Sequence, residues 1–128
     1  MRVAVFGTFD LLHPGHSFVL REAERRGDVT VVVARDATVQ RIKGRLPVQS
    51  EEERIRAISE TFPRMEVVLG DGTDFLLPIR TIQPDLILLG YDQRLPPGVG
   101  EADLQAPVER LPAFEPNRYK SSIRRNEQ

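Results

Sequence analysis

Cysteine is absent from this chain of 128 residues, and histidine occurs only twice. Without cysteine the protein cannot form disulfides, use a thiolate nucleophile or bind a metal ion through sulfur. Charge of one sign is not in excess either, because 18 lysines and arginines stand against 19 acidic residues. No overall positive field would therefore attract nucleic acid, and any anion-binding site must be local.

Long apolar runs are also missing. The sequence contains no stretch of about 18 uninterrupted apolar residues, which is the length needed to cross a membrane. Met1-Arg2-Val3 leads directly into a strand-like segment, without a charged leader followed by an apolar stretch. We therefore expect a cytoplasmic protein with no membrane partner. The length predicts one domain, residues 1–128, which is small for an enzyme with two substrates and favours a homodimer that shares its active site.

Strand-like apolar runs alternate with helix-like segments along the chain. Continuous apolar strands separated by helices indicate a parallel sheet covered on both faces, an α/β fold of the Rossmann-like three-layer sandwich type. Ligands of such folds bind at the loops that follow the carboxyl ends of the strands. The expected strands are 3–6, 29–34, 65–69 and 86–89, and the expected helices are 15–26, 50–62 and 74–82.

Some of these segments carry stronger signals than others. The helix at 50–62 is the best supported, because a capping box opens it at Ser50. The helix at 74–82 is expected to be weakened by Pro78, which lacks a backbone donor. Residues 93–118 are rich in proline and predict a loop or a substrate-specific lid, with one short strand around 108–111.

The ten residues that directly follow the first apolar run, GTFDLLHPGH at 7–16, are the most informative segment. Gly7 permits a sharp exit from the strand, and Gly15, after a proline, suits the first turn of a helix. Such a turn brings free backbone N–H groups, the positive end of the helix dipole and the imidazoles of His13 and His16 to one place. The segment therefore predicts a loop that binds the phosphates of a nucleotide.

The two histidines lie three positions apart, so both could face the α-phosphate of that nucleotide. Attack on an α-phosphorus needs no protein nucleophile, but it needs aligned reactants and neutralised phosphate charge. His13 and His16 would donate hydrogen bonds to the phosphate oxygens as charge develops there. Alternatively, the pair is incidental, or it binds a metal ion with Asp10 as the third ligand.

The same ten residues resemble the signature of the nucleotidyltransferase superfamily of the cytidylyltransferase type, His-x-Gly-His within Gly-Thr-Phe-Asp-Leu-Leu-His. The resemblance implies that the chain joins a nucleoside triphosphate to a phosphorylated acceptor and releases pyrophosphate. It also implies that the signature holds the α-phosphate and that Mg²⁺ bridges the nucleotide phosphates with few protein ligands. The nucleotide-binding residues expected in the signature are Gly7, Thr8, Phe9, Asp10 and Gly15.

A basic segment at 41–45 follows the second expected strand, in a loop or at a helix end. By resemblance, Lys43 contacts the triphosphate and is catalytic together with His13 and His16; by charge alone, the segment would be a solvated basic face. Arg54 lies in the capped helix, where the superfamily has an arginine in an acidic-x-Arg context. A simple surface charge paired with an acidic residue explains Arg54 equally well.

The segment LLGYDQ at 88–93 follows the fourth expected strand. Gly90 would let the backbone approach a nucleoside, and Asp92 could accept hydrogen bonds from ribose hydroxyls, as an acidic residue does in dinucleotide-binding folds. The alternative is a simple turn, for which Gly-x-Asp is suited.

Residues 117–125 resemble the Ser/Thr-rich terminal motif of the superfamily. In that motif, hydroxyls and amides at a helix start hold the β- and γ-phosphates, and Ser121 or Ser122 would suit the N-cap. The resemblance therefore implies that Ser121, Ser122 and Arg124 grip the leaving pyrophosphate. Without the signature at 7–16, this tail would be interpreted as a capped basic helix.

Two families of the superfamily compete for the chain. Glycerol-3-phosphate cytidylyltransferases, which use CTP, share the signature, but the chain differs from their terminal motif at 117–122. Archaeal-type FAD synthetases, which adenylylate FMN with ATP, resemble the chain over roughly residues 1–93 and again at the tail. FMN adenylylation is the favoured prediction, with cytidylylation of glycerol 3-phosphate second. A non-catalytic module of the same fold would bind nucleotide without releasing pyrophosphate.

Overall fold

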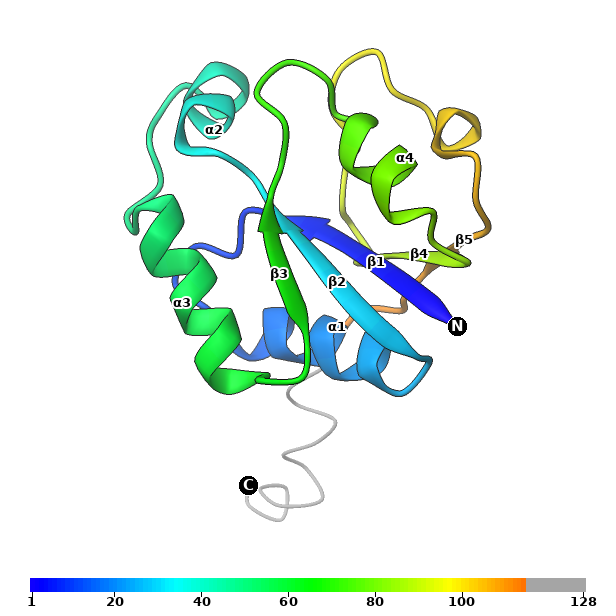
Figure 1. The fold of residues 1–128 in the computed structure, drawn as a ribbon. Coiled ribbons are helices and arrows are strands. Elements are labelled where there is room, and N and C mark those ends of the chain that lie inside the picture. The colour runs from blue at the N-terminus through cyan, green and yellow to red at the C-terminus, as the bar shows by residue number, and fades with distance from the viewer. Residues whose placement is uncertain (115–128) are drawn as a thin grey trace.

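The structure is a computed structural model that describes residues 1–114. Five strands form one sheet in the order β3-β2-β1-β4-β5, and every pair of neighbours is parallel (Figure 1). The predicted α/β fold with a parallel sheet is therefore confirmed. Its elements are β1 (Arg2–Gly7), α1 (Pro14–Glu24), β2 (Asp28–Val33), α2 (Asp36–Lys43), α3 (Glu51–Thr61), β3 (Glu66–Leu69), α4 (Leu77–Ile82), β4 (Leu86–Leu89), the 3-10 helix η1 (Glu101–Leu104) and β5 (Val108–Arg110).

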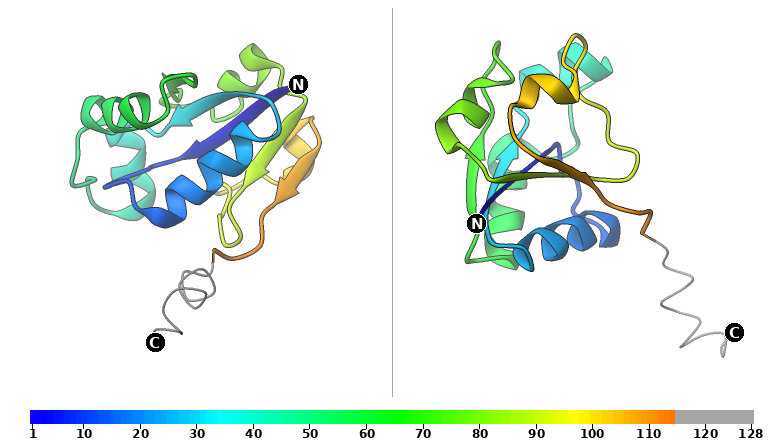
Figure 2. Two further views of the ribbon diagram at one scale, coloured as in Figure 1. Left: turned by 90° about the horizontal axis from the view of Figure 1, so that it is seen from below. Right: turned by 90° about the vertical axis from the view of Figure 1, so that its right-hand side faces the viewer.

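A hydrophobic core lies on each face of the sheet. On one face, Val3 and Val5 of β1 belong to a cluster with Leu20 of α1 and Ile58 of α3, none of which has exposed surface. On the other face, Phe6 packs with residues of α4 and η1. The right-hand view of Figure 2 shows α1 on one side of β4 and β5, with α4 and η1 on the other. The sheet is therefore the middle of three layers, as predicted.

The helix starts follow from local chemistry. In α3, Ser50 Oγ accepts from the Glu53 amide at 3.2 Å and the Glu53 carboxylate accepts from the Ser50 amide at 2.8 Å, so the predicted capping box is confirmed. The expectation that Pro78 weakens a helix at 74–82 is wrong. Helix α4 begins only at Leu77, which puts Pro78 in the first turn, where no backbone donor is needed.

Two helical segments were not expected from the sequence. Helix α2 carries Arg41 and Lys43 of the basic segment on its last turn, and its C-cap is Gly44, whose φ of 81° suits glycine. Within the region 93–118, the short strand is confirmed as β5, and η1 precedes it. Leu104 of η1 has no exposed surface, so this part of the region is core and not a lid. No helix within residues 1–114 is long and apolar enough to span a membrane.

Candidate active site

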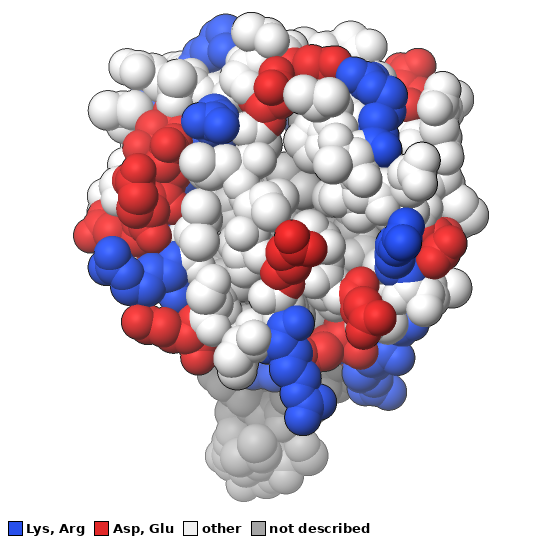
Figure 3. Space-filling view, viewed as in Figure 1, with Lys and Arg blue, Asp and Glu red and all other residues white. Residues whose placement is uncertain are grey.

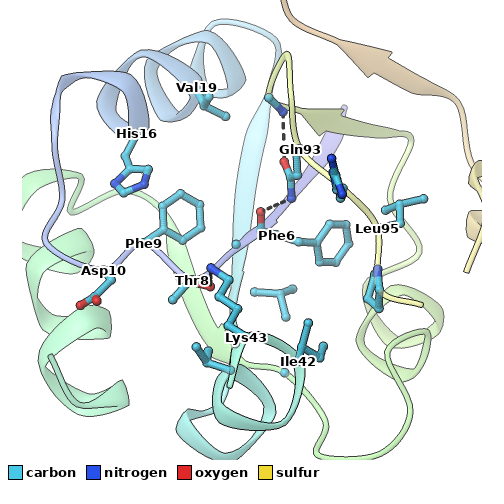
Figure 4. Close-up of a pocket in the computed structure, with 18 of the residues that line it drawn as sticks. Phe6, Thr8, Phe9, Asp10, His16, Val19, Ile42, Lys43, Gln93 and Leu95 are labelled. Carbon is cyan, nitrogen blue, oxygen red and sulfur yellow. Dashed lines mark hydrogen bonds between the residues drawn. The ribbon is translucent and has the colours of Figure 1, made fainter. Parts of the chain in front are cut away.

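The carboxyl ends of four strands, β1 to β4, open into a cavity of about 1130 Å³. The strand order changes direction between β1 and β4, and the crevice at such a switch point is the usual ligand site of open parallel sheets. The signature, the last turn of α2 and the loop after β4 meet in its wall (Figure 4). Among the residues predicted from the sequence, the lining includes Gly7, Thr8, Phe9, Asp10, His13, Gly15, His16, Lys43, Gly90 and Asp92.

The loop after β1 has a strained backbone. Phe9 and Leu11 both have a φ of 54°, in the left-handed region that residues other than glycine rarely adopt. Gly7 is required because a Cβ at this position would lie 2.8 Å from the Phe9 ring. Backbone strain of this kind persists where the surroundings hold it, and it is concentrated at functional sites.

His13 and His16 cap α1 reciprocally. Nδ1 of His13 accepts from the amides of Gly15 at 3.1 Å and His16 at 3.3 Å, and Nδ1 of His16 accepts from the His13 amide at 3.4 Å. The two rings stack with their centroids 3.6 Å apart. In a neutral imidazole whose Nδ1 accepts, the proton lies on Nε2. Both rings therefore offer an Nε2–H donor at the N-terminus of α1.

The environment of His16 keeps its imidazole neutral. Burial is the main reason why the pKa of His16 falls from 6.5 to about 4. The neighbouring His13 and Lys43 also lower this pKa, whereas Asp10 raises it. At neutral pH His16 is therefore a hydrogen-bond donor that carries no charge of its own.

We expect the Hε1 resonance of His16 to be nearly constant from about pH 8 to about pH 5.5 and to move near pH 4. An NMR titration measures this, and the spectrum of His16→Ala assigns the signal. Because the unfolded chain binds this proton near pH 6.5 and the folded chain only near pH 4, the contribution of His16 makes the free energy of unfolding fall as the pH drops through this window. Titration of His16 near 6.5 would contradict the burial of its ring.

Lys43 extends from the end of α2 to the signature. Its Nζ donates to Thr8 Oγ1 at 3.2 Å. In Figure 4 the Lys43 side chain lies between His16 on one side and Ile42 with Leu95 on the other. A contact with the signature is not expected of a merely solvated basic face. The neutralisation of phosphate charge by Lys43 stays a prediction.

The carboxylate of Asp10 joins the signature to the loop between α2 and α3. Its oxygens accept from the amides of Val48 at 2.8 Å and Gln49 at 2.9 Å. Burial acts to raise the pKa of Asp10, but the two amides, with the charges of Arg54 and Lys43, outweigh it and hold the pKa below 3.8. Within residues 1–114, no three His, Asp or Glu side chains are grouped so that they could hold a metal ion. These contacts explain Asp10 as a support of the loop, whereas a metal site would need further ligands.

Arg54 is fully buried, so its interpretation as a surface charge is wrong. Its guanidinium donates to the carbonyl of Thr8 at 2.8 Å, to the carbonyl of Gln49 at 3.2 Å and to the carboxylate of Asp36 at 2.7 Å. Since these partners lie in the signature, the α2–α3 loop and the first turn of α2, one side chain connects three segments around the cavity. Arg54 thus holds the backbone of Thr8 in position but does not itself line the cavity.

The loop after β4 is tied to β1 by Gln93. The side-chain oxygen of Gln93 accepts from the Gly90 amide at 3.0 Å, and its nitrogen donates to the Phe6 carbonyl at 2.8 Å, as the dashed lines in Figure 4 show. Asp92 in this loop is exposed and lines the cavity. Gln93 lies in the segment 88–93, but no role was predicted for it from the sequence.

Arg110, the last residue of β5, holds the same loop from the other side. Its Nη1 donates to the carbonyls of Gly90 at 2.9 Å and Gln93 at 2.8 Å, and its Nη2 contacts the Glu101 carboxylate at 3.3 Å. This role of Arg110 was not predicted from the sequence. No local pattern could have revealed it, because the two carbonyls are 20 and 17 positions away along the chain.

Charge around the site is local. Figure 3 shows side chains of both signs on the face in view, with acidic ones gathered over α3. The cavity wall itself carries four cations and three carboxylates: Arg35, Lys43, Arg45, Arg94, Asp10, Asp71 and Asp92. With a net charge of −1 for the whole chain, any anion site must be local, and the cations in this wall are where one would lie. The remaining predicted phosphate ligands, Ser121, Ser122 and Arg124, lie outside the described residues.

Several known proteins are similar to this chain. The sequence model of the family described as Cytidylyltransferase-like matches residues 4–125. The FAD synthase of Methanopyrus kandleri is 45% identical over 96 residues, which cover 72% of this chain and 63% of that protein. The FAD synthase of Archaeoglobus profundus is 40% identical over 130 residues, which cover 97% of this chain and 83% of that protein.

A solved structure has a similar fold. The lipopolysaccharide core biosynthesis protein from Thermoplasma volcanium GSS1 has a TM-score of 0.79 and 34% identity, over 90% of this chain and 98% of that chain. The match to the Methanopyrus protein thus covers somewhat less than two thirds of that relative, and the match to the Archaeoglobus protein covers most of it. Because the family match extends over almost the whole sequence, this chain belongs to the cytidylyltransferase-like family.

Proposed function

We propose that the protein transfers AMP from ATP to FMN, forming FAD and pyrophosphate. One observation carries the proposal: two stacked imidazoles with Nε2–H donors, the N-terminus of α1 and Lys43 surround one part of a single cavity. This is the donor set that a transferring phosphoryl group needs. The choice of ATP and FMN is supported by the FAD synthase relatives and by the family match.

The reaction would proceed by in-line displacement. An oxygen of the FMN phosphate attacks the α-phosphorus of ATP and forms the new P–O bond, while the bond from that phosphorus to the bridging oxygen breaks. The bonding electrons leave with pyrophosphate. Because the attacking phosphate is already an anion near neutral pH, the protein need not remove a proton from it. Catalysis then depends on alignment and on stabilisation of the charge that develops on the α-phosphate.

The three predicted catalytic residues each have a place in this mechanism. The Nε2–H groups of His13 and His16 donate to the α-phosphate oxygens, and Lys43 neutralises their charge. ATP would enter as its magnesium complex, in which the ion would neutralise part of the phosphate charge. We propose Ser121, Ser122 and Arg124 as the ligands of the leaving pyrophosphate.

The loop after β4 would receive the nucleoside. Gly90 lets the backbone approach the base, and Asp92 accepts from the ribose hydroxyls. Arg110 does not line the cavity, but it fixes the carbonyls of this loop. It is therefore a positioning residue for ATP.

Arg110→Met is expected to raise KM for ATP about tenfold, with a smaller change in kcat. The loss corresponds to about 1.4 kcal/mol, which is reasonable for hydrogen bonds from a charged donor. Steady-state kinetics with ATP as the varied substrate measures it. Arg64→Met, an exposed arginine just before β3, is the matched control, and Arg110→Lys should recover part of the loss. An unchanged KM for ATP in Arg110→Met would mean that the loop does not bind the nucleotide.

The proposed reaction is tested by pyrophosphate release with magnesium, for ATP and CTP each combined with FMN, glycerol 3-phosphate and several sugar phosphates. Release only with ATP and FMN is the expected result, and mass spectrometry should identify FAD. Release with CTP and glycerol 3-phosphate would replace the proposal with the second candidate. Nucleotide binding without any release would indicate the non-catalytic module.

The oligomeric state and the location of the protein are also proposed. We propose a homodimer, because 128 residues are few for binding two large substrates. We also propose a cytoplasmic location, on the composition of the chain.

A further inference from the structure

The hydrophobic core on the α4 face is not closed at the carboxyl edge of the sheet. Phe6, Val32, Phe75 and Leu95 belong to this core or pack against it, and all four also line the cavity. The rings of Phe6 and Phe75 lie 5.3 Å apart, centroid to centroid. The core on this face therefore opens into the cavity and gives it an apolar wall.

This apolar compartment is separate from the imidazole pair. Figure 4 shows Phe6, Ile42 and Leu95 on one side of Lys43, with His16 on the other. Ile42 is 46% exposed although it is apolar and lines the cavity. The phosphate-binding groups thus occupy one part of the cavity, and the exposed apolar surface of Ile42 belongs to the other.

One polar atom in the wall lacks a partner. Among the buried side-chain oxygens and nitrogens of residues 1–114, only Thr38 Oγ1 makes no hydrogen bond. Thr38 lies on α2, one turn before Ile42, and lines the same cavity. Buried hydroxyl groups are nearly always hydrogen-bonded, so a polar group of a ligand is a suitable partner for this one once the Thr38 side chain rotates toward the cavity.

We infer that the compartment bounded by Ile42, Phe75 and Leu95 binds the isoalloxazine ring of FMN; this inference rests on the proposed function. The ring is flat and largely apolar, which suits an aromatic and aliphatic wall, and its polar edge can pair with Thr38 Oγ1. Lys43 lies at the boundary of the compartment, so the FMN phosphate would reach the point where Lys43 and the imidazoles hold the α-phosphate. The two substrates would then meet only at their phosphates.

The test measures FMN affinity separately from nucleotide affinity. Flavin fluorescence is titrated with wild-type protein and with Ile42→Gln and Phe75→Leu, in the absence and presence of a non-hydrolysable ATP analogue. Ile42 lies on a helix surface and Phe75→Leu keeps an apolar group, so both variants should fold. Val48→Gln is the matched control, because Val48 is 76% exposed and does not line the cavity.

We expect Kd for FMN to rise about tenfold or more in Ile42→Gln and Phe75→Leu, which is the usual effect of altering an apolar pocket. KM for ATP should be unchanged in both, and Val48→Gln should match the wild type. If the wild type makes FAD but neither variant changes Kd for FMN, the compartment does not bind the isoalloxazine ring, and the proposed function is unaffected. If the wild type binds FMN without making FAD, the proposed function fails, and the variants still decide the compartment. Absence of FMN binding at millimolar concentration would overturn both.

Discussion

His16→Ala is expected to lower kcat for FAD formation by at least about 100-fold while the protein stays folded. The substitution removes one Nε2–H donor from the α-phosphate, and the loss of one such donor lowers rates by about 100-fold to 1000-fold in comparable sites. Stability should change little, because Nδ1 of His13 still accepts from the amides of Gly15 and residue 16. The hydrogen bond that disappears, from the His13 amide to His16 Nδ1, is long at 3.4 Å, and the ring contacts of His16 with His13 and Phe9 are lost with it.

Rapid-quench measurement of FAD formation under saturating ATP and FMN gives the effect on the chemical step. Ser17→Ala, one position further along α1, is the matched control and should retain wild-type activity. Circular dichroism and urea denaturation verify that the variant is folded. Near wild-type turnover in folded His16→Ala would show that His16 does not stabilise the transition state.

Arg54→Leu is expected to destabilise the protein by about 3 kcal/mol. The guanidinium has no exposed surface, and its loss leaves the Thr8 and Gln49 carbonyls and the Asp36 carboxylate without their donor. Removal of one member of a buried charged network is strongly destabilising because the partner charge stays behind. The partial exposure of Asp36, 33% of its side chain, keeps the expected effect at the lower end of that range.

Urea denaturation gives the free energy of unfolding, and Arg56→Leu, on the exposed side of the same helix, is the matched control. Arg54→Leu combined with Asp36→Leu should recover part of the stability, since the unpaired carboxylate is then gone. If Arg54→Leu and Arg56→Leu were equally stable, the buried network would contribute nothing. At a temperature where the variant is folded, activity should also fall, because Thr8 loses the contact behind it.

The sequence predicted those parts of the molecule that depend on neighbours along the chain. Four strands were recognised from continuous apolar runs, and the start of α3 from a capping box formed within four residues. The signature indicated the site because its strand exit, cap and imidazoles all lie within ten residues. Helix α4 shows the limit of such reasoning, since the effect of Pro78 depended on where the helix begins.

The sequence by itself therefore determined the α/β class and pointed to the loop at 7–16, whose binding of phosphate stays a prediction. Only the tertiary structure decided that Arg54 is a buried link, that Arg110 holds the loop after β4, and that an apolar compartment adjoins the phosphate site. The reason is distance along the chain: Arg54 and Thr8 are 46 positions apart, and Arg110 and Gly90 are 20 apart. From sequence alone, a charged side chain is expected at the surface. Only the packing of the helices on the sheet can remove it from water and supply its partners.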